Sequence, residues 1–134
     1  MKIVHSMAYV MAFVFIVGET ARRGISYLAV NATTMFEDYF CGALLLAAAI
    51  SWTKKRKDAQ LWMAVAWAYA TGGMFVPFFA HLEAWMRGVT FRPDHPHADV
   101  HSILLKGVIW AICLACLVAT VRKSPPLNTA FAVR

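Results

Sequence analysis

The sequence predicts an all-α integral membrane protein, a bundle of four transmembrane helices, on the basis of three observations. Hydrophobic residues make up 60% of the 134 residues and charged residues only 15%, whereas soluble domains average roughly 45–50% apolar and about 25% charged residues. Four apolar runs approach or reach the roughly 20 residues that a helix needs to cross a membrane. These runs also lack the alternation of polar and apolar residues that membrane β-strands show. The length suits one domain, residues 1–134.

The four predicted helices cover residues 3–20, 36–53, 60–83 and 97–121. The last two are long enough by themselves, whereas the first two need polar flanks drawn into the membrane interface. A cleaved signal peptide is the alternative for the first run, but Glu19 stands where a small residue is preferred before cleavage. The segment between the first two helices has an apolar middle that is too short to span. It predicts an interfacial piece lying over the end of the bundle.

The charged residues predict the orientation of the bundle. If Lys2, the basic run 54–57 and the residues after the fourth helix face the cytoplasm, that side carries eight Lys and Arg residues and one acid. The other side then carries five Lys and Arg residues. The positive-inside rule favours both termini in the cytoplasm, and we expect a bacterial inner (plasma) membrane protein. Topology thus accounts for the net charge of +6, and no nucleic-acid partner is implied.

Acidic residues and histidines concentrate on the predicted outer side, which holds six of the seven acids and four of the five histidines. Ionisable residues at membrane depth are costly and usually face the bundle interior or water. Each predicted helix supplies such side chains at about the same level, so we expect them to form one polar, periplasm-facing pocket. Its predicted members are Glu19, Glu37, Asp38, His81, Glu83, His97, Asp99 and His101.

The stretch "FRPDHPHADVHS" is a candidate metal-binding motif. Pro96 suits the first turn of a helix, and His97 and His101 then lie four residues apart on one face. Such a pair presents two imidazoles to one ion, with His81 and Asp99 as further ligands. Carboxylate neighbours favour zinc or another divalent ion, while two axial histidines would instead suit haem. The alternative is that these polar residues cap the fourth helix in water.

Glu37 and Asp38 are candidate catalytic residues, together with His81. An adjacent acid pair can act as general acid and base when burial or the neighbouring charge raises one pKa. The structural alternative is that Glu37 and Asp38 cap the start of the second helix, where the helix dipole favours acids.

The other two acids also have structural alternatives. Glu83 lies four residues before Arg87, a spacing that suits an ion pair on one helix face. Glu19 precedes Arg22 and Arg23, and a pairing role would explain why two arginines stand on the predicted outer side.

Cys113 and Cys116 form a CxxC pattern in the fourth helix. In this the sequence resembles the vitamin K epoxide reductases, which are four-helix membrane proteins with a CxxC on the last core helix. The resemblance implies thiol redox chemistry, and it covers only this pattern and the helix count. The outer-loop cysteine pair of that family has no counterpart, because the sole other cysteine is Cys41. The alternative is that these small thiols are packing residues.

These features predict a small polytopic membrane protein whose outer pocket binds a divalent metal ion or a small polar or amphipathic ligand. It would be a membrane-embedded enzyme if the acids and His81 catalyse a reaction there. Two alternatives stay open. The small residues of "CGALLLAAA" would suit a non-catalytic accessory subunit of a larger membrane complex. A transporter of this length would need to form a homodimer.

Overall fold

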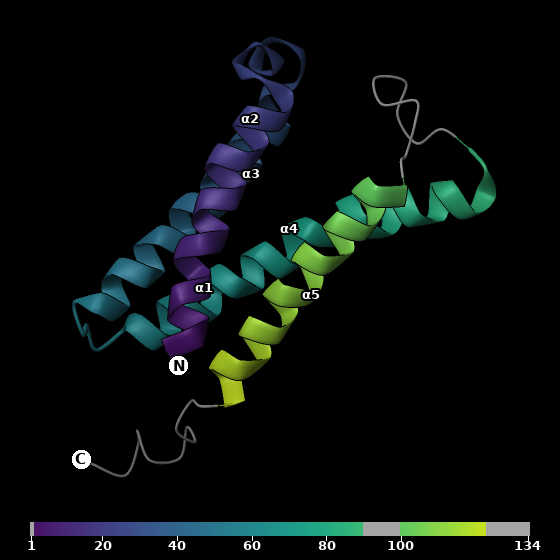
Figure 1. The fold of residues 1–134 in the computed structure, drawn as a ribbon. Helices are drawn as coiled ribbons and strands as arrows, with labels where there is room; N and C mark the ends of the chain where they lie inside the picture. The colour runs from purple at the N-terminus through teal and green to yellow at the C-terminus, as the bar shows by residue number, and fades with distance from the viewer. Residues whose placement is uncertain (1, 90–99, 123–134) are drawn as a thin grey trace.

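The computed structural model describes residues 2–89 and 100–122, and in these residues the protein forms helices and no strands (Figure 1). The elements in chain order are α1 (Lys2–Phe13), the π-helical turn η1 (Val14–Gly18), α2 (Glu19–Arg23), the 3-10 turn η2 (Ile25–Tyr27), α3 (Leu28–Thr53), α4 (Ala59–Arg87) and α5 (Val100–Arg122).

Four continuous helical stretches are long and apolar enough to cross a membrane: Lys2–Arg23, Ile25–Thr53, Ala59–Arg87 and Val100–Arg122. This confirms the all-helical fold and the number of candidate spans that the sequence predicts. Many large apolar side chains point outward, among them Phe13 and Phe36, each 64% exposed. Such an outer surface is typical of helices that face lipid rather than water.

The second span begins earlier than residue 36. The helix starts at Leu28 and is interrupted at Asn31, whose backbone is extended (φ −151°, ψ 80°). The Asn31 side-chain oxygen accepts a hydrogen bond from the backbone N–H of Thr34 at 3.2 Å, which is the geometry of a helix N-cap. Asn31 therefore caps the long part of α3, and Glu37 and Asp38 lie in the second turn of that part rather than at its start.

We expect Asn31→Ala to destabilise the folded protein by about 1 kcal/mol, because the N–H of Thr34 loses its acceptor. Asn31→Asp should preserve stability, since a carboxylate caps equally well. Equilibrium unfolding in mixed micelles would measure both. Equal losses for the two variants would contradict the capping role.

The helices associate as two pairs (Figure 1). The first span, from α1 to α2, runs along α3, and α4 runs along α5. The pairs are joined through contacts between α3 and α4, whereas α1 and α5 touch little. In Figure 1 the pairs lie close together near the N-terminus and diverge toward α2 and the end of α4.

Two glycines mark where helices approach most closely. A Cβ atom on Gly42 of α3 would lie 2.5 Å from Ile16 Cγ1 and 3.1 Å from the carbonyl oxygen of Ala12. A Cβ atom on Gly107 of α5 would lie 2.8 Å from the ring of Phe78 on α4. Small residues at such crossings let helix backbones approach closely in membranes. Gly42 and Gly107 therefore fix the contacts within the two pairs.

Sulfur-containing and aromatic side chains fill much of the core. Trp67, Met63 and Cys113 are fully buried there. Cys41, Cys113 and Cys116 are all buried and free of disulfides, and they belong to the same apolar core cluster. This is the environment that the packing interpretation of the cysteines expects.

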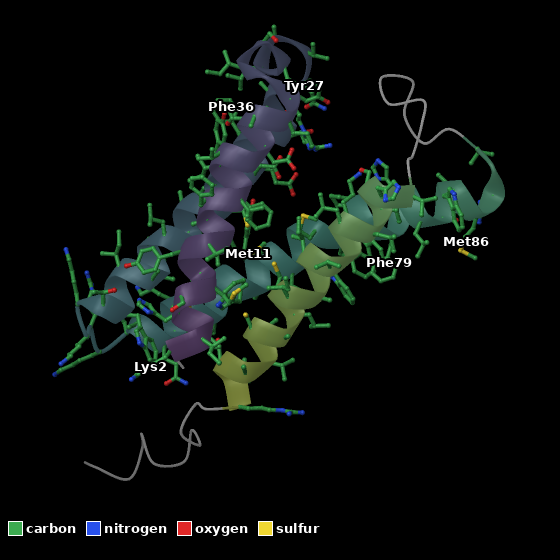
Figure 2. All side chains as sticks on the ribbon, in the orientation of Figure 1. Lys2, Met11, Tyr27, Phe36, Phe79 and Met86 are labelled. Carbon is green, nitrogen blue, oxygen red and sulfur yellow. The ribbon has the colours of Figure 1, made fainter. Side chains whose placement is uncertain are left out.

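The two ends of the molecule differ in charge. We call the end that carries Lys2, residues 54–57 and Arg122 the basic end, and the end that carries α2 the pocket end; Figure 2 shows Lys2 and Tyr27 at these opposite ends. At the basic end Asp58 accepts a hydrogen bond from the indole N–H of Trp62 at 2.9 Å. That bond, followed by the contact with Arg56, holds the pKa of Asp58 below its ordinary value.

Candidate functional site

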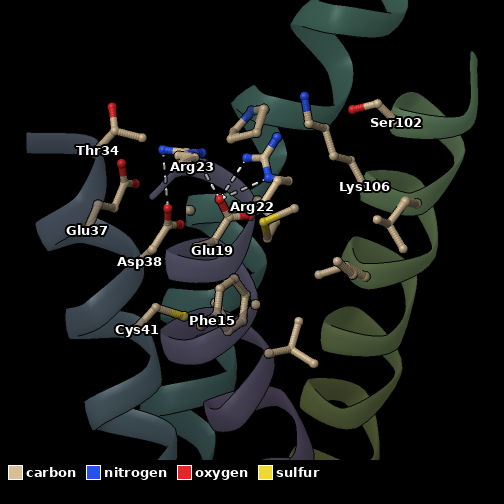
Figure 3. Close-up of a pocket in the computed structure, with 18 of the residues that line it drawn as sticks. Phe15, Glu19, Arg22, Arg23, Thr34, Glu37, Asp38, Cys41, Ser102 and Lys106 are labelled. Carbon is tan, nitrogen blue, oxygen red and sulfur yellow. Dashed lines mark hydrogen bonds and ion pairs between the residues drawn. The ribbon is translucent and has the colours of Figure 1, made fainter. Parts of the chain in front are cut away.

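A pocket of about 200 Å³ lies between the two helix pairs, toward the pocket end (Figure 3). All four spans contribute to its lining. A single buried water needs only about 15 Å³ of such space, so the pocket can hold more than an ordered solvent molecule. It is therefore the candidate ligand site of the described part of the chain.

The wall from α3 is one helical stripe. Thr34, Glu37, Asp38 and Cys41 line the pocket, and their spacing of three or four residues places them on one helix face. The walls from α4 and α5 have the same spacing. They consist of Tyr69, Ala70, Gly73, Met74 and Pro77 on α4, and of Ser102, Leu105, Lys106 and Ile109 on α5.

Polar and apolar residues are separated within the pocket. Figure 3 shows the charged side chains of Glu19, Arg23 and Asp38 grouped together, with Phe15 and Cys41 farther along the helices toward the basic end. Phe15 and Cys41 are each only 4% exposed. The pocket thus has a charged mouth and an apolar floor, an arrangement that suits a molecule with one polar and one apolar end.

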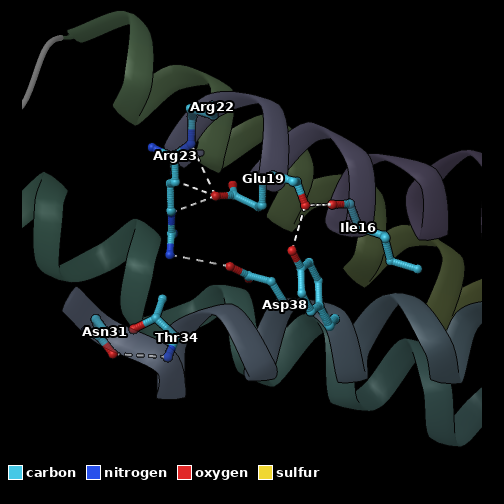
Figure 4. A network of polar contacts seen from close by, with 9 residues as sticks. Ile16, Glu19, Arg22, Arg23, Asn31, Thr34 and Asp38 are labelled. Carbon is cyan, nitrogen blue, oxygen red and sulfur yellow. Dashed lines mark hydrogen bonds and ion pairs between the residues drawn. The ribbon is translucent and has the colours of Figure 1, made fainter. Parts of the chain in front are cut away.

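Arg23 connects the acidic groups of the mouth (Figure 4). Its Nε lies 2.8 Å from Glu19 Oε2, and its Nη1 lies 3.6 Å from Asp38 Oδ2. The guanidinium also sits over the ring of Tyr27, 5.2 Å from the ring centre. Arg22 pairs with the same Glu19 oxygen at 2.6 Å. The predicted ion pairing of Glu19 with both arginines is confirmed, and it extends across to α3 through Arg23.

Asp38 is poorly satisfied in this network. Its side chain is 17% exposed, and Asp38 Oδ2 is buried without a hydrogen-bond donor among the described residues. The contact with Arg23 at 3.6 Å is too long for a hydrogen bond. A buried acceptor without a donor is costly, so Asp38 Oδ2 offers a favourable position for a ligand N–H or O–H group.

The π-helical turn η1 sets the direction of Glu19. A π-helical turn contains one residue more than an α-helical turn, which rotates all later side chains by about 100°. The carbonyl oxygen of Ile16 in this turn accepts a hydrogen bond from the Thr20 hydroxyl at 2.6 Å. The Tyr39 hydroxyl lies 2.8 Å from the same Thr20 oxygen. Tyr39 is the donor, because the only hydroxyl hydrogen of Thr20 already points to Ile16. This link fixes α2 against α3 beside the pocket.

The structure brings together three of the predicted site residues. Glu19, Glu37 and Asp38 line the pocket, whereas His81 and Glu83 of α4 are not among its lining residues. His81 follows Pro77 by one helical turn, and Pro77 is the last α4 residue of the lining. Glu83 instead forms the predicted alternative, an ion pair with Arg87 at 2.6 Å.

The predicted metal ligands within the described residues, His81 and His101, are not part of the pocket lining. His101 is exposed in the first turn of α5 and does not line the pocket, and His97 and Asp99 lie outside the described residues. Within residues 2–89 and 100–122, no three His, Cys, Asp or Glu side chains come close enough to hold a metal ion. The zinc site built on His81, His97, Asp99 and His101 and the haem alternative stay predictions.

Sequence reasoning missed Thr34, Tyr69, Ser102 and Lys106 as pocket residues. A signal was present, because polar side chains three, four or seven residues apart interrupt otherwise apolar spans. Thr34 stands four residues before Asp38, and Ser102 four residues before Lys106. Reading each span as a stripe of such residues would have found two of the pocket walls.

The fold and the site define a class: a small all-helical protein with four helices long and apolar enough to cross a membrane, and a charged pocket between them. Comparisons with protein-family models, with curated proteins and with solved structures find no match for this chain.

Proposed function

We propose that the protein spans a membrane with both termini in the cytoplasm and binds a small amphipathic ligand in the pocket. The orientation is supported by the concentration of Lys and Arg at the basic end, according to the positive-inside rule. The pocket then opens toward the outer side. Ile25 and Val30, 71% and 70% exposed, would lie in the outer membrane interface as the apolar side of an interfacial segment.

The observation that carries the proposal is the unsatisfied acceptor of Asp38 above an apolar floor. Asp38 Oδ2 is buried without a donor in the described part of the chain, while Phe15 and Met74 are buried apolar residues of the lining. A ligand whose polar end donates hydrogen bonds would satisfy Asp38, and its apolar part would cover the floor. Ligand sites commonly combine a mostly apolar lining with a few placed polar groups.

The carboxylates of the α3 wall favour a cationic polar end beside them, while Arg22, Arg23 and Lys106 balance the acids in the lining as a whole. Arg22 and Arg23 already pair with Glu19. Glu37 is exposed and lines the pocket, and it forms no hydrogen bond or ion pair within the described residues. Glu37 and Asp38 therefore offer carboxylate oxygens on one face of α3, and charge-assisted hydrogen bonds from an ammonium group would be the strong ones.

Protection of Cys41 tests the proposal, because Cys41 lines the pocket. A variant with Cys113→Ala and Cys116→Ala leaves one thiol, whose reaction with methyl methanethiosulfonate, a reagent that modifies thiols and not amines, is followed by intact mass. In lipid nanodiscs, dodecylamine should slow this reaction, and dodecanoate should slow it less. We expect Asp38→Asn to raise the dodecylamine concentration for half protection by about tenfold, the loss of one charge-assisted hydrogen bond.

Glu83→Gln is the matched control, because Glu83 is an exposed acid that does not line the pocket, and it should leave protection unchanged. No protection by dodecylamine, or equal protection in Asp38→Asn, would contradict the proposal. Protection by zinc chloride in place of dodecylamine would favour a metal site at the same carboxylates.

A further inference from the structure

A second hollow shares a wall with the pocket. It is a groove on the surface of α3 and α4, lined by Thr33, Phe36, Tyr39, Phe40 and Ala43 together with Glu37 and Tyr69. Glu37 and Tyr69 also line the pocket between the helix pairs. These two side chains therefore separate the inner pocket from the outer surface of the bundle.

Glu37 and Tyr69 are the only described residues that line both the groove and the pocket. On α4 the residue facing Glu37 is Gly73, where an added Cβ would lie 3.5 Å from Glu37 Oε1. With no side chain at Gly73, the passage is limited by Glu37 and Tyr69 themselves. Tyr69 is held from the groove side by the ring of Phe40, with ring centres 5.2 Å apart. Rotation of these side chains would connect the groove to the pocket without moving a helix.

The groove has the chemistry of a lipid-facing surface with one charged group. Phe36 and Phe40 are 64% and 54% exposed, so acyl chains would contact their rings. Glu37 stands beside them as an exposed carboxylate without an ion pair in the described residues. A carboxylate at membrane depth is costly unless it serves a pathway or a partner, and an ammonium group passing along the groove would neutralise it.

We propose that the ligand is a single-chain amphiphile with an ammonium group, and that it reaches the pocket from within the bilayer, between α3 and α4. The ammonium group passes from Glu37 to Asp38, which are adjacent on α3, while the chain follows past Tyr69. This inference rests on the proposed function, since it requires that the pocket bind such a molecule.

Kinetics of dodecylamine exchange test this route. Protein with Cys41 as its only thiol is loaded with dodecylamine in nanodiscs and mixed with an excess of empty lipid vesicles. The return of Cys41 reactivity toward methyl methanethiosulfonate then gives the release rate. Ala43→Trp should fill the groove, because Ala43 is exposed and lines the groove but not the pocket. We expect release and binding to slow together by about tenfold, with half protection at an unchanged concentration.

Ala47→Trp is the matched control, since Ala47 is also exposed and lies one turn farther along α3, outside the groove. Ala43→Leu should slow exchange less than Ala43→Trp. Unchanged rates in Ala43→Trp, with protection intact, would overturn the lateral route alone. Absence of protection in the unsubstituted pocket would overturn both the route and the proposed function.

Discussion

Arg23→Met is expected to destabilise the folded protein by about 2–3 kcal/mol. Removing one partner of a buried ion pair leaves the other charge uncompensated, which costs roughly 3–5 kcal/mol when both groups are fully buried. The side chains of Arg23 and Asp38 are 14% and 17% exposed, so the expected loss is somewhat smaller. Glu19 would keep Arg22, but Asp38 would lose its nearest cation. Equilibrium unfolding in mixed micelles measures the loss.

Arg22→Met is the control for this prediction. Arg22 pairs with the same Glu19 oxygen, but its side chain is 40% exposed, and exposed ion pairs contribute at most about 1 kcal/mol. Adding Asp38→Asn to Arg23→Met should recover part of the stability, because the uncompensated charge is then gone. Equal losses for Arg22→Met and Arg23→Met, or no recovery in the double variant, would show that Arg23 does not bridge the helices.

Gly42→Ala is expected to destabilise the protein by about 2 kcal/mol. The added methyl would lie 2.5 Å from Ile16 Cγ1 and 3.1 Å from the Ala12 carbonyl oxygen. The Ile16 side chain can rotate, but the Ala12 backbone can yield only if the first span moves away from α3. Overpacking of this kind typically costs about 1–3 kcal/mol. Unfolding of the purified variant gives the loss, and its Cys41 should become more reactive as the helices separate.

Gly72→Ala is the control, and its expected effect on stability has the opposite sign. A Cβ atom on Gly72 of α4 meets no described atom within 4 Å. In a helix interior, alanine is more favourable than glycine by about 1 kcal/mol. Gly72→Ala should therefore be neutral or stabilising, whereas Gly42→Ala is destabilising. Stabilisation by both substitutions would mean that Gly42 does not mark a close crossing.

The spans were predictable because length and apolar composition decide them locally. The start of the long part of α3 was not, since it depends on one side-chain cap at Asn31. The sequence also contains nothing that predicts the extra residue of the π-helical turn η1, which rotates Glu19 by about 100° relative to a regular helix. Such features depend on how a helix packs against its neighbour, and the periodicity of the sequence does not contain this information.

The acidic residues of the candidate site were predictable from the sequence, but the contact that Arg23 makes between α2 and α3 was not. Glu19, Glu37 and Asp38 were identified as ionisable groups at membrane depth, and they do line one pocket. The reach of Arg23 from α2 to Asp38 on α3 is a contact between separate helices, which sequence spacing does not encode. Counting turns placed His81 in the pocket, but the pocket lining on α4 ends one turn earlier, at Pro77.

Photolabelling with a dodecylamine that carries a diazirine on its chain tests the central claim most directly. The proposed binding mode predicts that mass spectrometry finds the label on the pocket floor, at Phe15, Met74 and Ile109. Excess dodecylamine should remove this label, and Asp38→Asn should reduce it. Labelling confined to lipid-facing residues such as Phe13, which is 64% exposed, and unaffected by competitor or substitution, would contradict a ligand site between the two helix pairs.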